Sequence, residues 1–150
     1  MSANTIAIGN DHSGVALKNK LVALLEARGL TVVNCGTDSE TSCDYPDLAQ
    51  KVVAAVADGR AARGVLICGT GLGMSYVANR RRGIRAALCW SQEVAALARE
   101  HNDSNLVVLP ARAKTLDPVE DILSAWLDTP FSRDPRHQRR IDKIEEKPNA

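Results

Sequence analysis

The segment GVLICGTGLGMS, residues 64–75, decides the fold: a compact apolar run ends in Cys68 and turns through three glycines. This order predicts a buried strand, a tight turn and the start of a helix. A thiol in such a turn lies beside unpaired backbone N–H groups, which favour a thiolate and can also hold an oxyanion of a substrate. The structural alternative is that Cys68 is a small buried hydrophobe and the glycines serve only the turn.

Short apolar runs alternate with helical periodicity along the rest of the chain. Because strands linked by helices nearly always form a parallel sheet covered on both faces, we expect an α/β, Rossmann-like three-layer sandwich with a five-stranded parallel sheet. One domain should span residues 1–150, and a basic helix should follow at the C-terminus. In the first helix, Leu21 and Leu25 should face the core while Lys18 and Lys20 lie largely on other faces. Strands are predicted over 5–9, 30–34, 64–68, 84–89 and 106–109, and helices over 14–28, 46–58, 74–79, 91–101 and 117–126.

Composition excludes several classes of protein. The 150 residues are 45% hydrophobic and 25% charged, which is typical of a globular protein. Lys and Arg number 19 against 18 Asp and Glu, so the net charge of +1 indicates neither nucleic acid nor a membrane surface as partner. No apolar run approaches the ~20 residues of a membrane span. A small molecule is the expected partner.

The cysteines and histidines carry no local metal-binding motif. Four cysteines occur without a CxxC pair, and the start of the chain does not resemble a signal peptide, so we expect free thiols in the reducing cytoplasm. His12, His101 and His137 are far apart in the sequence. We therefore expect no metal and no other cofactor.

The glycine turn fits nucleotide-binding motifs poorly. Gly69, Gly71 and Gly73 match part of a dinucleotide-binding fingerprint, but its spacing requires glycine at the position of Met74. The turn also follows the third predicted strand rather than the first. A P-loop is excluded because no Gly-Lys-Ser/Thr follows.

Ligands of such sheets lie beyond the carboxyl ends of the strands, which draws attention to loops 10–14, 68–73 and 100–103. His12 can face an anion and Asp11 can accept from a substrate hydroxyl, although Asp11 can equally cap a helix. His101 can act as an acid or base near neutral pH, or simply cap the preceding helix.

The basic C-terminal segment offers a possible anion clamp. Arg136 and Arg140 are four residues apart, so on a helix they share one face and can close on one anion. The alternative is a solvated basic surface.

Together these segments resemble the family of ribose-5-phosphate isomerase B and galactose-6-phosphate isomerase, over nearly the whole chain. The motifs that carry the resemblance are Gly9-Asn10-Asp11-His12, Asp44-Tyr45-Pro46, residues 66–75, Ala78-Asn79, Gly83-Ile84-Arg85-Ala86, residues 101–105 and Arg136-His137-Gln138-x-Arg140.

The resemblance implies a cofactor-free aldose–ketose isomerase of phosphorylated sugars. The expected reaction is ribose 5-phosphate to ribulose 5-phosphate through a cis-enediolate, with Cys68 as the base. Such chemistry needs one base that reaches two carbons and donors for the two oxygens. A tetrose 4-phosphate and allose or galactose 6-phosphate are alternative substrates. A non-catalytic sugar-phosphate or nucleotide-binding module is the alternative from another class.

The resemblance also assigns roles to individual residues. Thr70 is the implied hydroxyl partner of Cys68, and His101 and Asp11 are implied in opening the sugar ring. Tyr45 and Asn102 are implied in binding the sugar. The enediolate is implied to bind to the backbone around Gly69, Gly71, Gly73 and Ser75. The phosphate is implied to bind to the side chains of His12, Arg112, Arg136 and Arg140.

The same resemblance implies a homodimer or homotetramer with active sites between subunits, so that His101, Asn102 and Arg112 can serve the neighbour's site. One departure from the family concerns Pro110, which fixes φ where the family commonly has glycine and leaves the placement of Arg112 open. The run Arg80-Arg81-Arg82 is unusually basic, and we expect it to be a cationic cap at a helix end.

Overall fold

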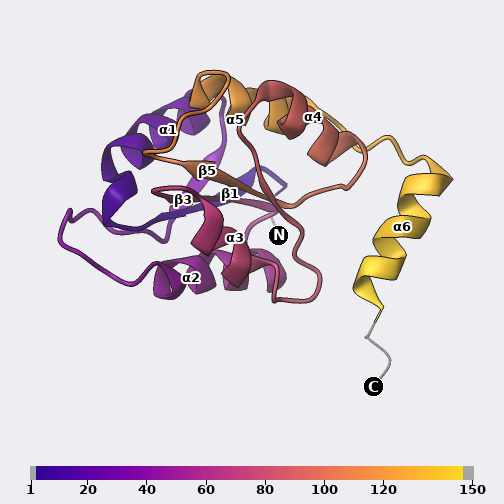
Figure 1. Cartoon of the computed structure of the whole chain (residues 1–150), viewed down its shortest axis with the longest axis horizontal. Helices are drawn as coiled ribbons and strands as arrows, with labels where there is room; N and C mark the ends of the chain where they lie inside the picture. The colour runs from indigo at the N-terminus through magenta and orange to yellow at the C-terminus, as the bar shows by residue number, and fades with distance from the viewer. Residues whose placement is uncertain (1–2, 147–150) are drawn as a thin grey trace.

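The fold is described by a computed structural model that covers residues 3–146. Within these residues, five parallel strands form one sheet in the order β2-β1-β3-β5-β4. The strands are β1 (Thr5–Asn10), β2 (Thr31–Asn34), β3 (Arg63–Cys68), β4 (Ala86–Leu88) and β5 (Leu106–Pro110). Helices lie on both faces of the sheet, so the predicted Rossmann-like sandwich is confirmed (Figure 1).

The helices divide between the two faces of the sheet. In Figure 1, α1, α4 and α5 cover one face, and α2 and α3 cover the other. Alternate residues of each strand build the two cores: Ile6 and Ile8 of β1 face the first group, and Ala7 faces the second. The helices are α1 (Val15–Ala27), α2 (Tyr45–Ala57), α3 (Leu72–Ala78), α4 (Gln92–Glu100), α5 (Val119–Asp128) and α6 (Pro135–Glu145), with a 3-10 turn η1 (His12–Gly14) before α1.

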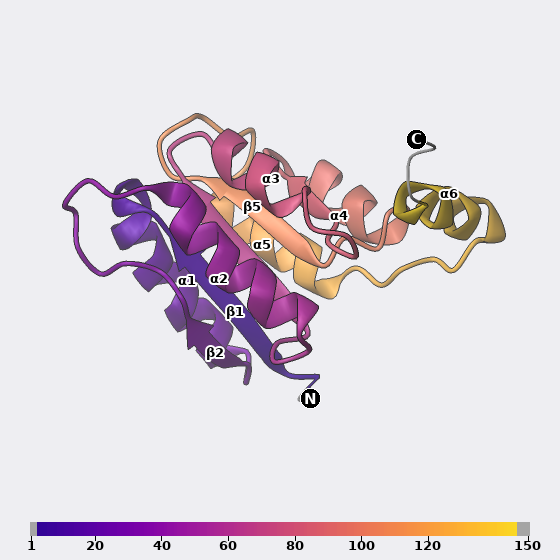
Figure 2. The ribbon, with the colours of Figure 1, turned by 90° about the horizontal axis from the view of Figure 1, so that it is seen from below.

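The basic helix α6 stands apart from the three layers. It follows an extended connection after α5 and projects beyond the sheet at the end of the molecule (Figure 2). Two polar contacts fasten its last turn: Glu145 accepts from the Arg85 guanidinium at 2.9 Å and from the Gly83 N–H at 2.9 Å. Its buried residues are His137 and Ile141.

Strand β4 is shorter than the sequence predicts, with three residues instead of 84–89. Ile84 belongs to a turn, where its N–H donates to Arg81 O at 3.1 Å. The Asn79 side chain binds both the N–H and the C=O of Ala86, each at 2.9 Å. An asparagine amide therefore occupies the outer edge of β4 at its start, where another strand would otherwise pair.

Lys18 corrects the prediction for the first helix. It is fully buried, whereas Lys20 is exposed as expected and pairs with Glu120. Lys18 Nζ donates to Thr37 O at 3.0 Å and pairs with Asp38, both in the loop after β2. A buried lysine of this kind is stable only because its charge has these partners.

Candidate active site

The chain order of the strands reverses beside β1, because β2 lies on one side of β1 and β3 on the other. Ligands of open α/β sheets bind at such a reversal, outside the carboxyl ends of the strands. Two hydrogen bonds tie these ends together: Asp11 N–H donates to Ile67 O at 3.2 Å, and Ala111 N–H donates to Cys68 O at 2.8 Å. The loops after β1, β3 and β5 therefore meet around Cys68.

Cys68 is the last residue of β3, and the residue is 4% exposed. Its Sγ accepts a hydrogen bond from the Gly71 N–H at 3.2 Å. Gly71 has φ +83°, and an added Cβ would lie 2.4 Å from a Leu88 methyl carbon. Only glycine tolerates both this positive φ and this close approach of Leu88. The glycine thus aims a backbone N–H donor at the sulfur.

The first turn of α3 supplies further donors beside this thiol. Helix α3 begins at Leu72, and Ser75 N–H makes the first helical bond, to Gly71 O. Within residues 3–146, the N–H groups of Gly73 and Met74 have no backbone acceptor, as is usual for a helix start. These two N–H groups can hold an oxyanion.

Two hydroxyl groups border the same turn. Thr70 Oγ1 accepts from the Leu72 N–H at 3.2 Å, which leaves its own proton for another partner. Ser75 Oγ instead donates to Leu72 O at 2.7 Å. Thr70 is therefore the hydroxyl of this turn with a proton to offer, while the Ser75 hydroxyl proton is already engaged.

Tyr45 lies over Gly73 as one wall of the site. An added Cβ on Gly73 would lie 2.4 Å from Cζ and 2.8 Å from the hydroxyl oxygen of Tyr45. The ring therefore rests directly on the glycine, and Tyr45 as a residue remains 38% exposed. This contact places an aromatic ring with a polar tip beside the free N–H of Gly73.

Asp11 caps the 3-10 turn η1, and its carboxylate can still accept a further hydrogen bond. Its Oδ1 accepts from the Ser13 N–H at 3.0 Å and from the Ser13 hydroxyl at 2.5 Å. Its side chain is buried at the end of β1. Because a carboxylate accepts through two oxygens, Oδ2 can still take a substrate hydroxyl.

His12 is oriented by the loop that precedes α2. Its Nδ1 accepts the Cys43 N–H at 3.3 Å. An imidazole nitrogen that accepts carries no proton, so the proton is on Nε2. His12 thereby offers an N–H donor from the opposite side of its ring.

The structure shows where Arg112 lies after Pro110. Strand β5 keeps its parallel register through Pro110, which pairs with Cys68, and the chain then turns so that Arg112 N–H donates to Gly69 O at 3.0 Å. A Cβ added to Gly69 would lie 3.9 Å from Arg112 Cδ and 3.8 Å from Ser13 Oγ. Arg112 therefore lies beside the turn after Cys68, on the same chain.

The other described thiols lie in different surroundings. All four cysteines are free. Burial raises the pKa of Cys89 to about 12, and its Sγ donates to Ala87 O. Burial also raises the pKa of Cys35, although Arg60 and Lys51 oppose that rise. Neither thiol shares the backbone donor that Cys68 has.

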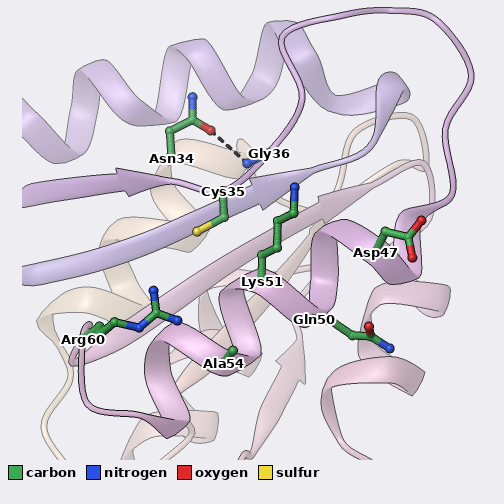
Figure 3. Close-up of a pocket in the computed structure, with 8 residues that line it drawn as sticks. All are labelled: Asn34, Cys35, Gly36, Asp47, Gln50, Lys51, Ala54 and Arg60. Carbon is green, nitrogen blue, oxygen red and sulfur yellow. Dashed lines mark hydrogen bonds between the residues drawn. The ribbon is translucent and has the colours of Figure 1, made fainter.

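Cys35 lies in an open pocket of about 720 Å³ between β2 and α2 (Figure 3). Lys51 and Arg60 reach into this pocket from α2 and from the turn that follows it. It shares no residue with the loops around Cys68.

Loop 100–103 corrects the expectation that three loops meet at one edge of the sheet. Helix α4 runs back from the carboxyl edge, so His101 at its end lies at the amino edge. Asn105 O accepts the N–H of Gly64, at the start of β3. Cys68 is four residues further along that strand, about 13 Å away at about 3.3 Å per residue. Within one chain, His101 and Asn102 do not join the Cys68 site.

The last three residues of the 101–105 motif hold this loop in place. Asp103 pairs with Arg99, and Ser104 Oγ accepts from Trp126 Nε1 at 2.8 Å. Asn105 Oδ1 accepts from the Arg85 N–H at 2.9 Å. These contacts leave the side chains of His101 and Asn102 for other partners.

Helix α6 brings its basic residues to the same amino edge. The His101 and His137 rings are stacked, with centroids 4.2 Å apart and an angle of 19° between the planes. Arg136 Nη2 lies 3.4 Å from His137 Nε2, and Arg140 is one turn further along the helix. Burial, and then the nearby His101, lower the pKa of His137.

Candidate site residues therefore form two clusters at opposite edges of the sheet. The carboxyl-edge cluster contains Asp11, His12, Tyr45, Cys68, Gly69, Thr70, Gly71, Gly73, Ser75 and Arg112. The amino-edge cluster contains His101, Asn102, Arg136 and Arg140.

The part of the chain that the structure describes contains neither a cluster of metal-binding side chains nor a helix suited to a membrane. Across residues 3–146, no group of three or more His, Cys, Asp or Glu side chains is arranged to hold a metal ion. In the same part of the chain, no helix has both the length and the apolar character needed to cross a membrane.

The fold and the carboxyl-edge cluster define a class: an α/β protein with a cysteine, backbone oxyanion donors and cationic side chains at a strand reversal, suited to proton transfer on an anionic substrate. Comparison with known proteins makes the class specific. A family model described as Ribose/Galactose Isomerase matches residues 6–144. The chain belongs to this family, and it is an aldose–ketose isomerase of phosphorylated sugars rather than a non-catalytic binding module.

Individual relatives agree with this assignment. The chain is 43% identical over 139 residues to ribose-5-phosphate isomerase B of Escherichia coli K12, covering 93% of both proteins. It is 41% identical over 128 residues to a D-erythrulose-4-phosphate isomerase of Pectobacterium atrosepticum, covering 85% of this chain and 84% of that protein. The structure of a ribose 5-phosphate isomerase from Thermotoga maritima matches with a TM-score of 0.90 and 48% identity, covering 96% and 99% of the two chains.

Proposed function

We propose that this isomerase interconverts ribose 5-phosphate and ribulose 5-phosphate, with Cys68 as the base. The observation that carries the proposal is the Gly71 N–H directed at Cys68 Sγ, with the unpaired N–H groups of Gly73 and Met74 in the next turn. One sulfur and two backbone donors are what proton transfer between adjacent carbons requires. The likeness to ribose-5-phosphate isomerase B of E. coli favours the five-carbon substrate.

The chemistry is balanced without an external oxidant. The Cys68 thiolate removes the proton from C2 of the open-chain aldose, and the electron pair of that bond forms the C1–C2 double bond. The charge passes to the C1 oxygen, which the N–H groups of Gly73 and Met74 stabilise as an enediolate. The Cys68 thiol then returns its proton to C1, and Thr70 relays the O2 proton to the O1 oxyanion, so that the C2=O of the ketose forms and the thiolate is restored.

The site is completed by a second copy of the chain. His101, Asn102, Arg136 and Arg140 lie at the opposite edge from Cys68 in one chain. A symmetric dimer can bring the amino edge of one subunit over the carboxyl edge of the other, twice. His101 of one copy then opens the sugar ring with Asp11 of the other, and Asn102 binds sugar hydroxyls.

The phosphate is held by cationic groups from both copies. His12 and Arg112 lie on the Cys68 side, and Arg136 and Arg140 come from the neighbour. Phosphate bound at a distance from C1 and C2 supplies binding energy that orients those carbons at the sulfur. The length of the sugar is then set by the distance between this clamp and Cys68, and the erythrulose phosphate relative makes a tetrose 4-phosphate the second candidate.

A panel of sugar phosphates tests the proposed substrate. The purified protein is assayed with a tetrose 4-phosphate, ribose 5-phosphate, and allose and galactose 6-phosphates, first with a chelator present and then after excess divalent metal ion is added. We expect the highest kcat/KM for ribose 5-phosphate. A higher kcat/KM for a four- or six-carbon sugar would replace the substrate and keep the mechanism, whereas no turnover of any sugar until metal is added would contradict the mechanism.

A further inference from the structure

Lys18 is a charged group in the interior that the isomerisation chemistry does not use. Its side chain is fully buried, and its partners are Thr37 O, at 3.0 Å, and the carboxylate of the exposed Asp38. The hydrogen bond from Lys18, and then the charge of Lys18, lower the pKa of Asp38. A lysine buried in helix α1 therefore holds the loop formed by residues 35–44, here called the β2–α2 loop.

The same point of the loop is bound to the end of β1. Asn10 Nδ2 donates to Thr37 O at 3.0 Å, so this carbonyl accepts from Lys18 and Asn10 together. Thr37 N–H donates back to Asn10 O at 3.4 Å. Gly36 lies so close that an added Cβ would be 1.9 Å from Asn10 Oδ1. Because Asn10 directly precedes Asp11 and His12, the junction joins the β2–α2 loop to the site.

The rest of the β2–α2 loop is shaped mainly by local hydrogen bonds. Ser39 N–H donates to Thr37 Oγ1, and Thr41 N–H donates to Ser39 Oγ, each at 3.1 Å. Such turns shape the loop but do not attach it to the sheet. At its far end, Cys43 N–H donates to His12 Nδ1. The orientation of His12 therefore depends on where the loop is fastened.

We propose that Lys18 is a positioning residue for substrate phosphate, acting through the β2–α2 loop on His12. With the loop held at Thr37 and Asp38, Cys43 N–H occupies His12 Nδ1 and keeps the ring proton on Nε2. That tautomer presents an N–H donor to a phosphate oxygen. The proposal rests on the assignment of His12 to the phosphate in the proposed function.

The test compares two lysine variants of the same helix. Lys18→Met removes the buried ammonium group and keeps a side chain of similar length, whereas Lys20→Met removes an exposed ammonium group from helix α1 that touches Glu120 rather than the loop. The first readout is the nitrogen-15 NMR shifts of the His12 ring, which report the tautomer. The second is steady-state kinetics with ribose 5-phosphate and the affinity for inorganic phosphate.

We expect Lys18→Met to raise KM, and the dissociation constant of phosphate, about tenfold, which is about 1.4 kcal/mol. The kcat should change little, and the Nε2–H tautomer of His12 should lose its dominance. Lys20→Met should match the wild type in all readouts. Asp38→Asn should shift KM in the same direction, and combining it with Lys18→Met should add less than the sum of the single effects, because the two residues act as a pair.

The outcomes separate the proposal from the function on which it rests. A folded Lys18→Met with wild-type KM and wild-type His12 tautomer overturns the positioning role. If Lys18→Met fails to fold, Asp38→Asn decides the matter with the same readouts. If the wild type binds phosphate but isomerises no sugar, the proposed function fails, while the NMR shifts and phosphate affinity still judge Lys18.

Discussion

A mixture of two inactive variants tests whether the active site is shared between subunits. Cys68→Ala removes the proposed base at the carboxyl edge, and His101→Asn removes the proposed ring-opening group at the amino edge. The two positions lie at opposite ends of β3, because the loop that carries His101 is bonded to Gly64. The separation along the strand is about 13 Å, which is too far for both side chains to contact the same atoms of one sugar.

The expected recovery follows from counting sites in a symmetric dimer. With free exchange at equal concentrations, about half of the dimers are mixed and each has one intact site of two, so activity should reach about a quarter of the wild-type value. The variants are purified separately, mixed under conditions that allow subunit exchange, and assayed with ribose 5-phosphate. Each variant alone should show only background turnover.

Two outcomes would refute this reasoning. If mass spectrometry shows mixed oligomers but activity stays at background, the two clusters do not serve one site across the interface. If His101→Asn alone retains wild-type activity, the amino edge has no part in the chemistry. A control mixture of Cys68→Ala with Cys68→Ser should recover nothing, since both variants lack the same thiol.

Three further predictions follow from contacts already described. Gly73→Ala places a Cβ against the Tyr45 ring, so kcat/KM should fall about 10- to 100-fold in a folded protein, and an unchanged value would show that Tyr45 does not shape the site. Arg136→Ala combined with Arg140→Ala should weaken phosphorylated sugars far more than the matching free sugars, and equal losses for both would remove the clamp. The pKa of His137 is lowered in the folded protein, so the unfolded chain binds a proton at His137 more readily than the folded one. The stability that the neutral His137 contributes is therefore present above about pH 6.5 and is lost as the pH falls further. Among the charged neighbours of His137, Asp134 favours the protonated ring, whereas His101, Arg136 and Arg140 favour the neutral ring. The protection factors of the α6 amides, which divide out the intrinsic pH dependence of hydrogen exchange, should therefore fall between pH 7.5 and 5.5 more in the wild type than in His137→Gln, and equal pH dependence in both would contradict the effect.

The sheet and the thiol turn follow directly from local sequence. Apolar runs of strand length that alternate with helical segments predict parallel strands, and the order of the chain places Cys68 at the carboxyl end of the third strand. Gly71 and Gly73 mark positions where the backbone must bend or come close to a neighbour, and the structure gives each such a reason. These features depend on residues that are close together in the sequence, which is why the local sequence pattern predicts them.

To predict which edge of the sheet carries His101, one must know the direction of the helix that precedes it. Composition and motif spacing do not give that direction. A helix after a parallel strand runs back across the sheet, so its C-terminal loop lies at the amino edge. That argument was available from the predicted order of elements alone. In one chain His101 and Cys68 lie at opposite edges of the sheet, and their grouping is part of the proposal that a second copy completes the site.

Burial of Lys18 could not be predicted from helical periodicity. Periodicity assigns lysine to the polar side, and the partner that makes burial possible, Asp38, is twenty residues away in an irregular loop. Likewise, the shortening of β4 depends on the Asn79 side chain binding the backbone of Ala86. In both cases a polar side chain pairs with a distant segment, and that pairing overrides the local pattern.

The most direct measurement for the central claim is solvent deuterium incorporation at C2 of ribose 5-phosphate, followed by NMR for the wild type and Cys68→Ala. The wild type should incorporate deuterium as it isomerises. Cys68→Ala should bind the sugar phosphate with similar affinity and incorporate none above the uncatalysed rate. Incorporation by Cys68→Ala at a rate near that of the wild type would show that another group is the base.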